Sequence, residues 1–326
     1  MKHQSLFFFF HFVLVTITGI AQTTTNKEPE LIFQSGFEGN SKVVPDLSSE
    51  DHGAHYEYIT GTDKSLNKKS NWDLDWLAAL STRVMQVQYT GGDSAKRFAK
   101  VVPEPGNPKN HVLHYWLNDS WPASEGQIKA RIQTNLYGIK GGYKEFYQSV
   151  RVFLTEDFNA LKNYPHKIPW CTISEFWNNE WWVAGEPYGF RITLGVGKPV
   201  EENSELYFIL EGENMGQKLV WRADYAKLKV AIPIGKWFTM EYYFKEGNKE
   251  TGRFYLAITP DGGSKQVVYD EHNFTHNTSD PAPNGITGYN PMKLYTSKEV
   301  VGFVNAQGKT LQIYWDDFKL WKNKRP

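Results

Sequence analysis

Most of the chain alternates apolar and polar residues with a period of two, which is the pattern of β-strands that have one buried face. Residues 127–136 place apolar or small side chains at every second position and polar ones between them. The pattern recurs at 147–154 and 190–194, and further strands are predicted at 205–211, 219–225, 237–245, 252–259 and 311–321. Turns rich in Gly, Asn and Pro separate these segments. The pattern therefore predicts an all-β, two-sheet antiparallel β-sandwich.

One short helix is predicted near the C-terminus, over residues 296–308. Thr296 and Glu299 have the spacing of a capping box, and Gly308 is a typical helix stop. We expect no other helix from residue 83 onward.

The N-terminal segment has the features of a secretory signal. Lys2 precedes an apolar run from Leu6 to Ile20, and small residues follow before a Thr-rich stretch. The run is too short to favour a membrane span. We expect a signal peptide at 1–21, a linker at 22–30 and a single domain at 31–326, in a secreted or periplasmic protein. The only cysteine, Cys171, is too far along the chain to anchor a lipid at the cleavage site.

Composition limits the partners of the protein. Lys plus Arg and Asp plus Glu both number 36, so no overall field attracts a nucleic acid or a membrane surface, and an anionic substrate needs a local group of cations. Aromatic residues make up 15% of the chain. These rings either fill the core of the sandwich or line a groove in which they stack on sugar faces.

Three of the predicted strands carry an arginine on the face opposite their aliphatic residues. Arg131, with Gln133 beside it, lies on the first strand, Arg151 on the second and Arg191 on the third. Arginine binds carboxylates through two parallel hydrogen bonds, so several arginines in one groove would bind an acidic chain. The alternative is that each arginine pairs with a neighbouring Asp or Glu.

Lys167 lies between Pro165 and Pro169, after the strand that holds Arg151. Positive neighbours disfavour the charged form of a lysine, which makes Lys167 a candidate general base. The alternative is an ordinary solvated loop lysine.

Five segments between about residues 145 and 320 form an ordered set of motifs. They are Ser149 to Phe158 continuing to His166-Lys167-Ile168-Pro169, Gly189 to Leu194, Tyr207-Phe208-Ile209, Trp237 to Glu241, and Tyr314-Trp315-Asp316-Asp317-Phe318. These segments resemble, in the same order, the motifs of jelly-roll polysaccharide lyases that cleave glucuronan and alginate. Compared with that family, the double glycine before the lysine is absent, and Trp170, Gly189 and Ile209 replace a glycine, a serine and a tyrosine.

The resemblance implies a concanavalin A-like jelly roll and β-elimination on a uronic-acid polysaccharide such as glucuronan, alginate or an ulvan-like chain. Arg191 would neutralise the uronate carboxylate with help from Arg151 or Gln133. Lys167 or Tyr207 would remove the C5 proton, and the tyrosine would protonate the departing oxygen. No cofactor is required for this chemistry. We further expect Glu175, Trp177 and His276 to contact the substrate.

Two other functions fit the same sequence. A non-catalytic glycan-binding module would use the same arginines and aromatic residues without Lys167 or Tyr207. A glycoside hydrolase needs two carboxylates across one bond, for which Glu175 and Glu180 are the candidates.

A structural calcium ion is a separate expectation. Glu38 follows the first predicted strand and Asp317 lies in the last, and first and last strands are neighbours in many jelly rolls. The alternative is that these carboxylates accept hydrogen bonds from nearby backbone.

Overall fold

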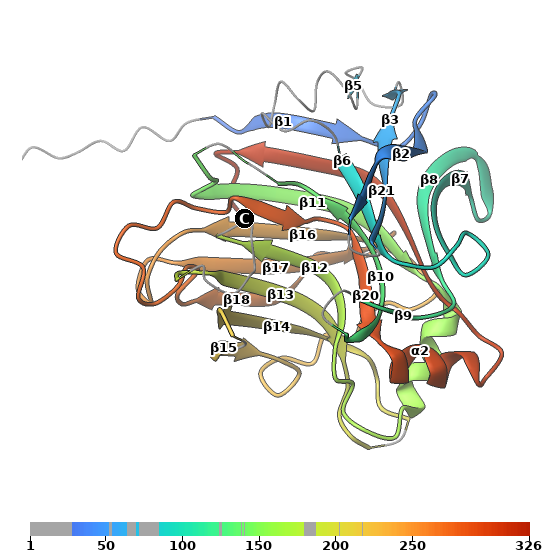
Figure 1. Ribbon diagram of the computed structural model, residues 1–326. Coiled ribbons are helices and arrows are strands. Elements are labelled where there is room, and N and C mark those ends of the chain that lie inside the picture. The colour runs from blue at the N-terminus through green and yellow to red at the C-terminus, as the bar shows by residue number, and fades with distance from the viewer. Residues whose placement is uncertain are drawn as a thin grey trace, which may run out of the picture.

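The computed structural model shows two antiparallel sheets packed face to face, as the alternating pattern predicted (Figure 1). It describes residues 28–51, 54–63, 70–71, 85–123, 126–137, 139, 141–178, 187–201, 203–216 and 218–326. The expected signal peptide lies outside the described residues, as does the linker up to residue 27.

We call the first layer sheet A. In order across the sheet, its strands are β18 (Gln266–His272), β17 (Arg253–Pro260), β16 (Trp237–Lys245), β11 (Glu145–Leu154), β21 (Leu311–Lys322), β8 (Asn107–Leu117) and β7 (Arg97–Glu104). The first strand, β1 (Glu30–Ser35), also pairs with the last, β21. The expectation that first and last strands are neighbours is therefore confirmed.

The second layer is sheet B. Its strands run in the order β15 (Lys218–Ala223), β14 (Tyr207–Asn214), β13 (Phe190–Gly197), β12 (Cys171–Trp177), β20 (Lys293–Ser297), β10 (Ile128–Asn135), β6 (Met85–Thr90), β3 (Ala54–Thr60) and β2 (Lys42–Asp51). Two short strands, β19 (Gly288–Asn290) and β9 (Trp121–Pro122), pair with β12 and β10. A separate pair, β4 (Thr62–Asp63) with β5 (Ser70–Asn71), lies outside both sheets.

The core lies between the sheets and is built by the alternation read from the sequence. Val150 and Val152 of β11 and Ile192 and Leu194 of β13 are fully buried. A fully buried side chain of this kind stabilises the fold by roughly 1.5–3 kcal/mol. Many of the aromatic residues also belong to this core, where the rings of Phe146, Phe176 and Tyr289 lie within 6.0 Å of one another, centroid to centroid.

In the part of the chain that the structure describes, two short helices flank the sheets. The C-terminal helix α2 (Lys298–Asn305) confirms the prediction, but its N-cap is Ser297, whose hydroxyl accepts a hydrogen bond from the amide of Val300. The predicted capping box at Thr296 is wrong because that hydroxyl donates to the carbonyl of Trp170 instead. A 3₁₀ helix, η1 (Glu156–Asn163), was not expected. No helix in the described part of the chain is long and apolar enough to cross a membrane.

Candidate functional site

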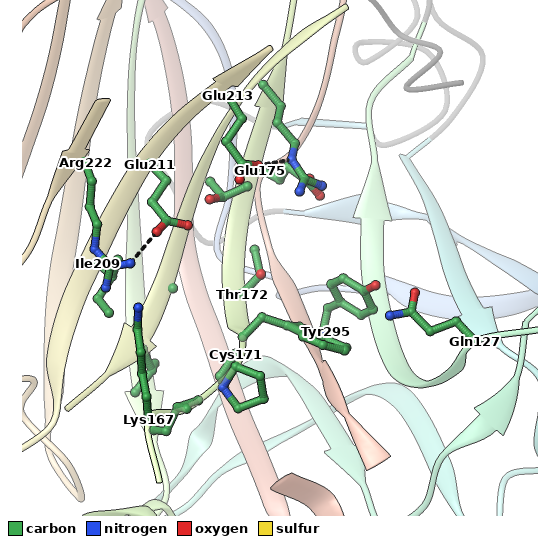
Figure 2. A pocket seen from close by; sticks show the side chains of 17 residues that line it. Gln127, Lys167, Cys171, Thr172, Glu175, Ile209, Glu211, Glu213, Arg222 and Tyr295 are labelled. Atoms are coloured by element: carbon green, nitrogen blue, oxygen red, sulfur yellow. Dashed lines mark hydrogen bonds and ion pairs between the residues drawn. The ribbon is translucent and has the colours of Figure 1, made fainter. Parts of the chain in front are cut away.

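A pocket of about 340 Å³ opens on the face of sheet B that points away from the core (Figure 2). Strands β12, β13, β14 and β20 supply its floor, and the segment after η1 supplies one side. Both charged and apolar side chains line it. They are Gln127, Lys167, Ile168, Pro169, Trp170, Cys171, Thr172, Glu175, Arg191, Thr193, Gly195, Val196, Ile209, Glu211, Glu213, Arg222 and Tyr295.

A β-bulge in β12 decides which side chains face the pocket. The pairing of β12 with β13 shifts by one residue between Thr172 and Ser174. Strict alternation would place Glu175 on the same face as the core residue Ile173, whereas the extra residue turns it to the pocket. The same shift keeps Phe176 in the core.

Glu175 is the centre of a buried charge cluster. Its Oε1 accepts a hydrogen bond from Arg191 Nη1 at 3.0 Å, and its Oε2 accepts a short bond from Lys293. Arg191 also donates to Glu213 at 2.7 Å. Burial alone would raise the pKa of Glu175, but the charges of Lys293 and Arg191 hold it at about 2. Glu175 is therefore ionised at every physiological pH.

Carboxamides hold this cluster from the side of β10. Lys293 donates to Asn290 Oδ1 at 3.0 Å, and Asn290 donates to Asn135 at 2.8 Å. Gln133 donates to Asn135 at 2.7 Å and to Gln88 at 2.9 Å. Because these amides are mostly buried and bonded to one another, they fix the position of Lys293.

Tyr295 carries the most distinctive electrostatic environment of the site. Its ring is half-buried, and three cationic groups lie around it: Lys293 Nζ at 5.0 Å from the ring centroid, Arg131 Cζ at 5.8 Å and Lys129 Nζ at 5.9 Å. Burial, followed by the charge of Arg131, lowers the pKa of Lys129 to about 8. A lysine that is partly neutral near physiological pH can accept a proton.

The opposite wall of the pocket is formed by β14 and β15. Glu211 accepts a hydrogen bond from Arg222 Nη1 at 2.7 Å, and Arg222 also donates to Asp224 at 3.0 Å. Lys167 is exposed below them, at the lower left of Figure 2. Among the residues that the structure describes, Lys167 forms no ion pair, so it is available to an anionic ligand.

The structure brings most of the predicted site residues together. Lys167, Glu175 and Arg191 line the pocket. Arg131 lies directly across from Tyr295 in the pairing of β10 with β20, and Gln133 lies across from Lys293. Trp177 follows Glu175 on β12, where its ring stacks on Tyr137 at 5.5 Å and lies 5.9 Å from Lys293 Nζ. Arg191 pairs with Glu175 and Glu213, as the alternative interpretation of the arginines proposed, whereas Arg131 donates to the hydroxyl of Thr90.

Three predicted residues lie elsewhere. Arg151 belongs to β11 of sheet A, so the prediction that all three arginines share one groove is wrong; similar alternation does not say which sheet a strand joins. Tyr207 begins β14 beside the ring of Tyr225, and it does not line the pocket. His276 lies in the loop after β18, buried against Phe274 with Nδ1 2.7 Å from the carbonyl oxygen of Asn277.

The carboxylates proposed for calcium do not form a cluster in the structure. Glu38 binds the backbone amide and the imidazole of His111, at 2.6 and 3.0 Å. Asp317 has a positive φ of 47° within β21 and lies 3.9 Å from Lys319 Nζ. Within the described ranges, no group of three or more His, Cys, Asp or Glu side chains is arranged to hold a metal ion.

Lys293, Tyr295 and Lys129 line or adjoin the site but were not predicted from the sequence. Lys293 and Tyr295 alternate with the buried Met292 and Leu294, which is a strand pattern. This pattern is short and ends where the predicted helix begins, at residue 296, so no strand was predicted there. Lys129 was on the polar face of a correctly predicted strand, but only the structure shows its burial.

Comparisons with known proteins return solved structures of polysaccharide lyases. The chain is similar to an endo-β-1,4-glucuronan lyase from the fungus Trichoderma reesei, with 15% identity, a TM-score of 0.43, and coverage of 70% of this chain and 88% of that one. It is also similar to a PL-14 alginate lyase from Aplysia kurodai, with 12% identity, a TM-score of 0.40, and coverage of 68% of this chain and 86% of that one. A third similar structure is alginate lyase Aly36B, with 12% identity, a TM-score of 0.41, and coverage of 86% of this chain and 96% of that one.

Glucuronan and alginate lyases are also the proteins that the sequence motifs resemble. No protein-family model matches the chain, and no curated protein matches it. Similarity at this level does not carry the activity of these proteins over to this chain.

Proposed function

We propose that the protein is a polysaccharide lyase that cleaves a uronic-acid chain by β-elimination on the pocket face of sheet B. The observation that carries the proposal is the group of three cations, Lys129, Arg131 and Lys293, around the half-buried phenol of Tyr295 at the edge of an open pocket. Elimination from a uronate needs a cation at the carboxylate, a base at C5 and an acid at O4.

The residues divide among these tasks by their chemistry. Arg131 neutralises the carboxylate of the sugar that loses its proton, which makes the C5 proton acidic enough to remove. Lys129 accepts that proton, because its lowered pKa of about 8 leaves a neutral fraction near neutral pH. As the C4–O4 bond breaks and the C4–C5 double bond forms, the hydroxyl of Tyr295 donates its proton to O4.

The remaining charged residues bind the polymer or hold other side chains in position. Lys167 contacts the carboxylate of a neighbouring sugar in the pocket. Glu175 keeps Lys293 and Arg191 in place and does not exchange protons, since its pKa of about 2 makes it a poor general acid. This argues against a hydrolase based on Glu175; its proposed partner Glu180 lies outside the described residues.

The experiment follows ultraviolet absorbance of unsaturated uronate while the protein is incubated with a panel of uronic-acid polysaccharides. We expect one polymer to give a rise. Tyr295→Phe and Lys129→Arg should each lower kcat by roughly 100-fold or more, because each removes one proton transfer. Lys167→Ala should raise KM and leave kcat close to that of the wild type.

Two tyrosines act as matched controls. Tyr207→Phe tests the tyrosine that the sequence motifs singled out, and Tyr255→Phe changes a buried tyrosine of sheet A. Both should retain wild-type kcat. Loss of activity in Tyr207→Phe with activity retained in Tyr295→Phe would reject our assignment of the acid. Polymer binding without any absorbance change would instead identify a glycan-binding module.

A further inference from the structure

The outer face of sheet A, on the side of the molecule opposite the pocket, carries a row of aromatic side chains. The outer face of an antiparallel sandwich usually alternates to polar residues, so a run of rings there departs from the pattern. Five strands contribute to it: β7, β8, β21, β11 and β16. The row, which we call the aromatic row, consists of Trp116, Phe98, His114, Tyr314, Phe153 and Trp237.

The rings contact one another without a break. Phe98 stacks on Trp116 at 5.4 Å and meets the edge of His114 at 5.1 Å. His114 stacks on Tyr314 at 4.1 Å. Phe153 then joins Tyr314, at 6.0 Å, to Trp237, at 5.3 Å.

The row is accessible and uncharged. Its members are partly exposed, except His114, which is buried against its neighbours. Burial lowers the pKa of the His114 imidazole to about 4, so this ring is neutral at physiological pH. Contiguous exposed apolar groups on a soluble protein mark an interaction surface.

Charges at the two ends of the row differ. The ammonium of Lys100 lies 4.5 Å from the ring centroid of Phe98, and within the described part of the chain this exposed lysine has no carboxylate partner. At the other end, Arg151 lies 4.1 Å over Trp237 but is held by Glu104, Asp261 and Asp316. An anionic group on a ligand is therefore favoured at the Lys100 end.

The narrowness of the row indicates what binds there. Five partly exposed rings, each exposing at most about a third of its roughly 200 Å² surface, present at most about 350 Å². A stable interface between two copies of the chain buries about 800 Å² on each partner. A sugar chain, which is narrow and has apolar C–H faces, needs less area and suits a line of rings.

We propose that the aromatic row is a second, non-catalytic binding site for the acidic polysaccharide. The apolar faces of its sugars lie against the rings, and a uronate carboxylate lies at Lys100. The identity of this ligand rests on the proposed function, but its binding does not require turnover. A site on the opposite side of the molecule from the pocket holds a long polymer near the enzyme and gains avidity only when the chain is long enough to reach both.

The test is retardation in native gels that contain polyglucuronate, alginate or a neutral β-glucan. We expect the acidic polymers to retard the wild type and the Tyr295→Phe variant equally. Lys100→Glu, an exposed change that leaves the core intact, should lose most of the retardation, as should Trp116→Ala. Retention of full retardation in both variants would overturn the proposal, as would retardation by the neutral polymer alone.

Kinetics and solution size separate the remaining outcomes. If the wild type is active, Lys100→Glu should raise KM about fivefold or more on polymer and leave kcat and the KM for short oligosaccharides unchanged. If the wild type shows no turnover, the proposed function fails while retardation still tests the row. A dimer in sedimentation experiments that dissociates in Trp116→Ala would assign the row to self-association and overturn the proposal.

Discussion

Removal of the Glu175 carboxylate is the perturbation for which the structure gives the clearest magnitude. The carboxylate is almost fully buried, and its pKa of about 2 lies well below the ordinary 4.5 because of Lys293 and Arg191. Since each tenfold change in proton affinity corresponds to ~1.4 kcal/mol, the ionised form contributes about 3 kcal/mol to folding. Glu175→Gln loses this contribution and leaves the buried Lys293 without its anion.

We expect Glu175→Gln to lower the free energy of unfolding by roughly 3–5 kcal/mol at pH 7. Urea unfolding followed by tryptophan fluorescence measures it. Lys293→Met should also destabilise, and the double variant should lose less than the sum because the two changes remove one interaction. As a control, Asp119→Asn disrupts the exposed ion pair with Lys96 and should cost about 1 kcal/mol or less.

The pH dependence gives an independent check. A carboxyl with a lowered pKa stabilises the fold above its unfolded pKa, and this stabilisation is lost as pH falls through the folded value. For Glu175 the window runs from about pH 5 down to about pH 2. The wild type should therefore lose its advantage over Glu175→Gln across that window. A difference below 1 kcal/mol at pH 7, or one that does not change on acidification, would refute this reasoning.

Other parts of the molecule give further predictions. Burial raises the pKa of Asp316 to about 6 despite Arg151 at 3.3 Å, so this group stabilises the fold below about pH 4 and that contribution is lost as pH rises through 6. Asp316→Asn should therefore raise stability at pH 8 by up to about 3 kcal/mol and change it little at pH 4, which urea titrations at the two pH values measure. Gly212→Ala places a methyl group 2.3 Å from the indole of Trp221 and should cost about 1–3 kcal/mol, read as a lower melting temperature by circular dichroism. The kcat of the wild type should rise as pH increases toward 8, whereas the kcat of Lys129→Met should not. Stopped assays at several pH values measure this, and the same dependence of kcat on pH in both proteins would exclude Lys129 as the base.

The strands were predictable because each has one face in a large apolar core. Ala130, Ile132, Val150 and Ile192 are all buried at the positions that the period of two assigns them. The alternation describes each strand by itself, so it predicts neither the sheet that a strand joins nor the order of the strands. Arg151 shows the consequence, since its strand has the same pattern as that of Arg131 yet belongs to the other sheet.

The site was harder to predict because its geometry depends on irregular features. The bulge in β12 moves Glu175 from the core face of the strand to the pocket face. The alternation of residues 171–177 does not predict this bulge. Lys293 is an ordinary lysine in sequence and becomes a buried partner of Glu175 only when β20 inserts between β10 and β12.

The proposed chemistry follows from how sheet B distributes charge. Glu175 and Glu213 bind Arg191, and Glu211 binds Arg222, so the acidic side of the pocket is neutralised by its own arginines. Around Tyr295, Arg131 donates to the hydroxyl of Thr90, and Lys293 shares the carboxylate of Glu175 with Arg191. An anionic sugar is therefore attracted toward the phenol and away from the glutamates of β14. In the proposed mechanism this asymmetry places the reacting uronate beside Tyr295, and it predicts that Arg131→Glu, which reverses the local charge, weakens binding of uronate oligosaccharides far more than Arg222→Glu does.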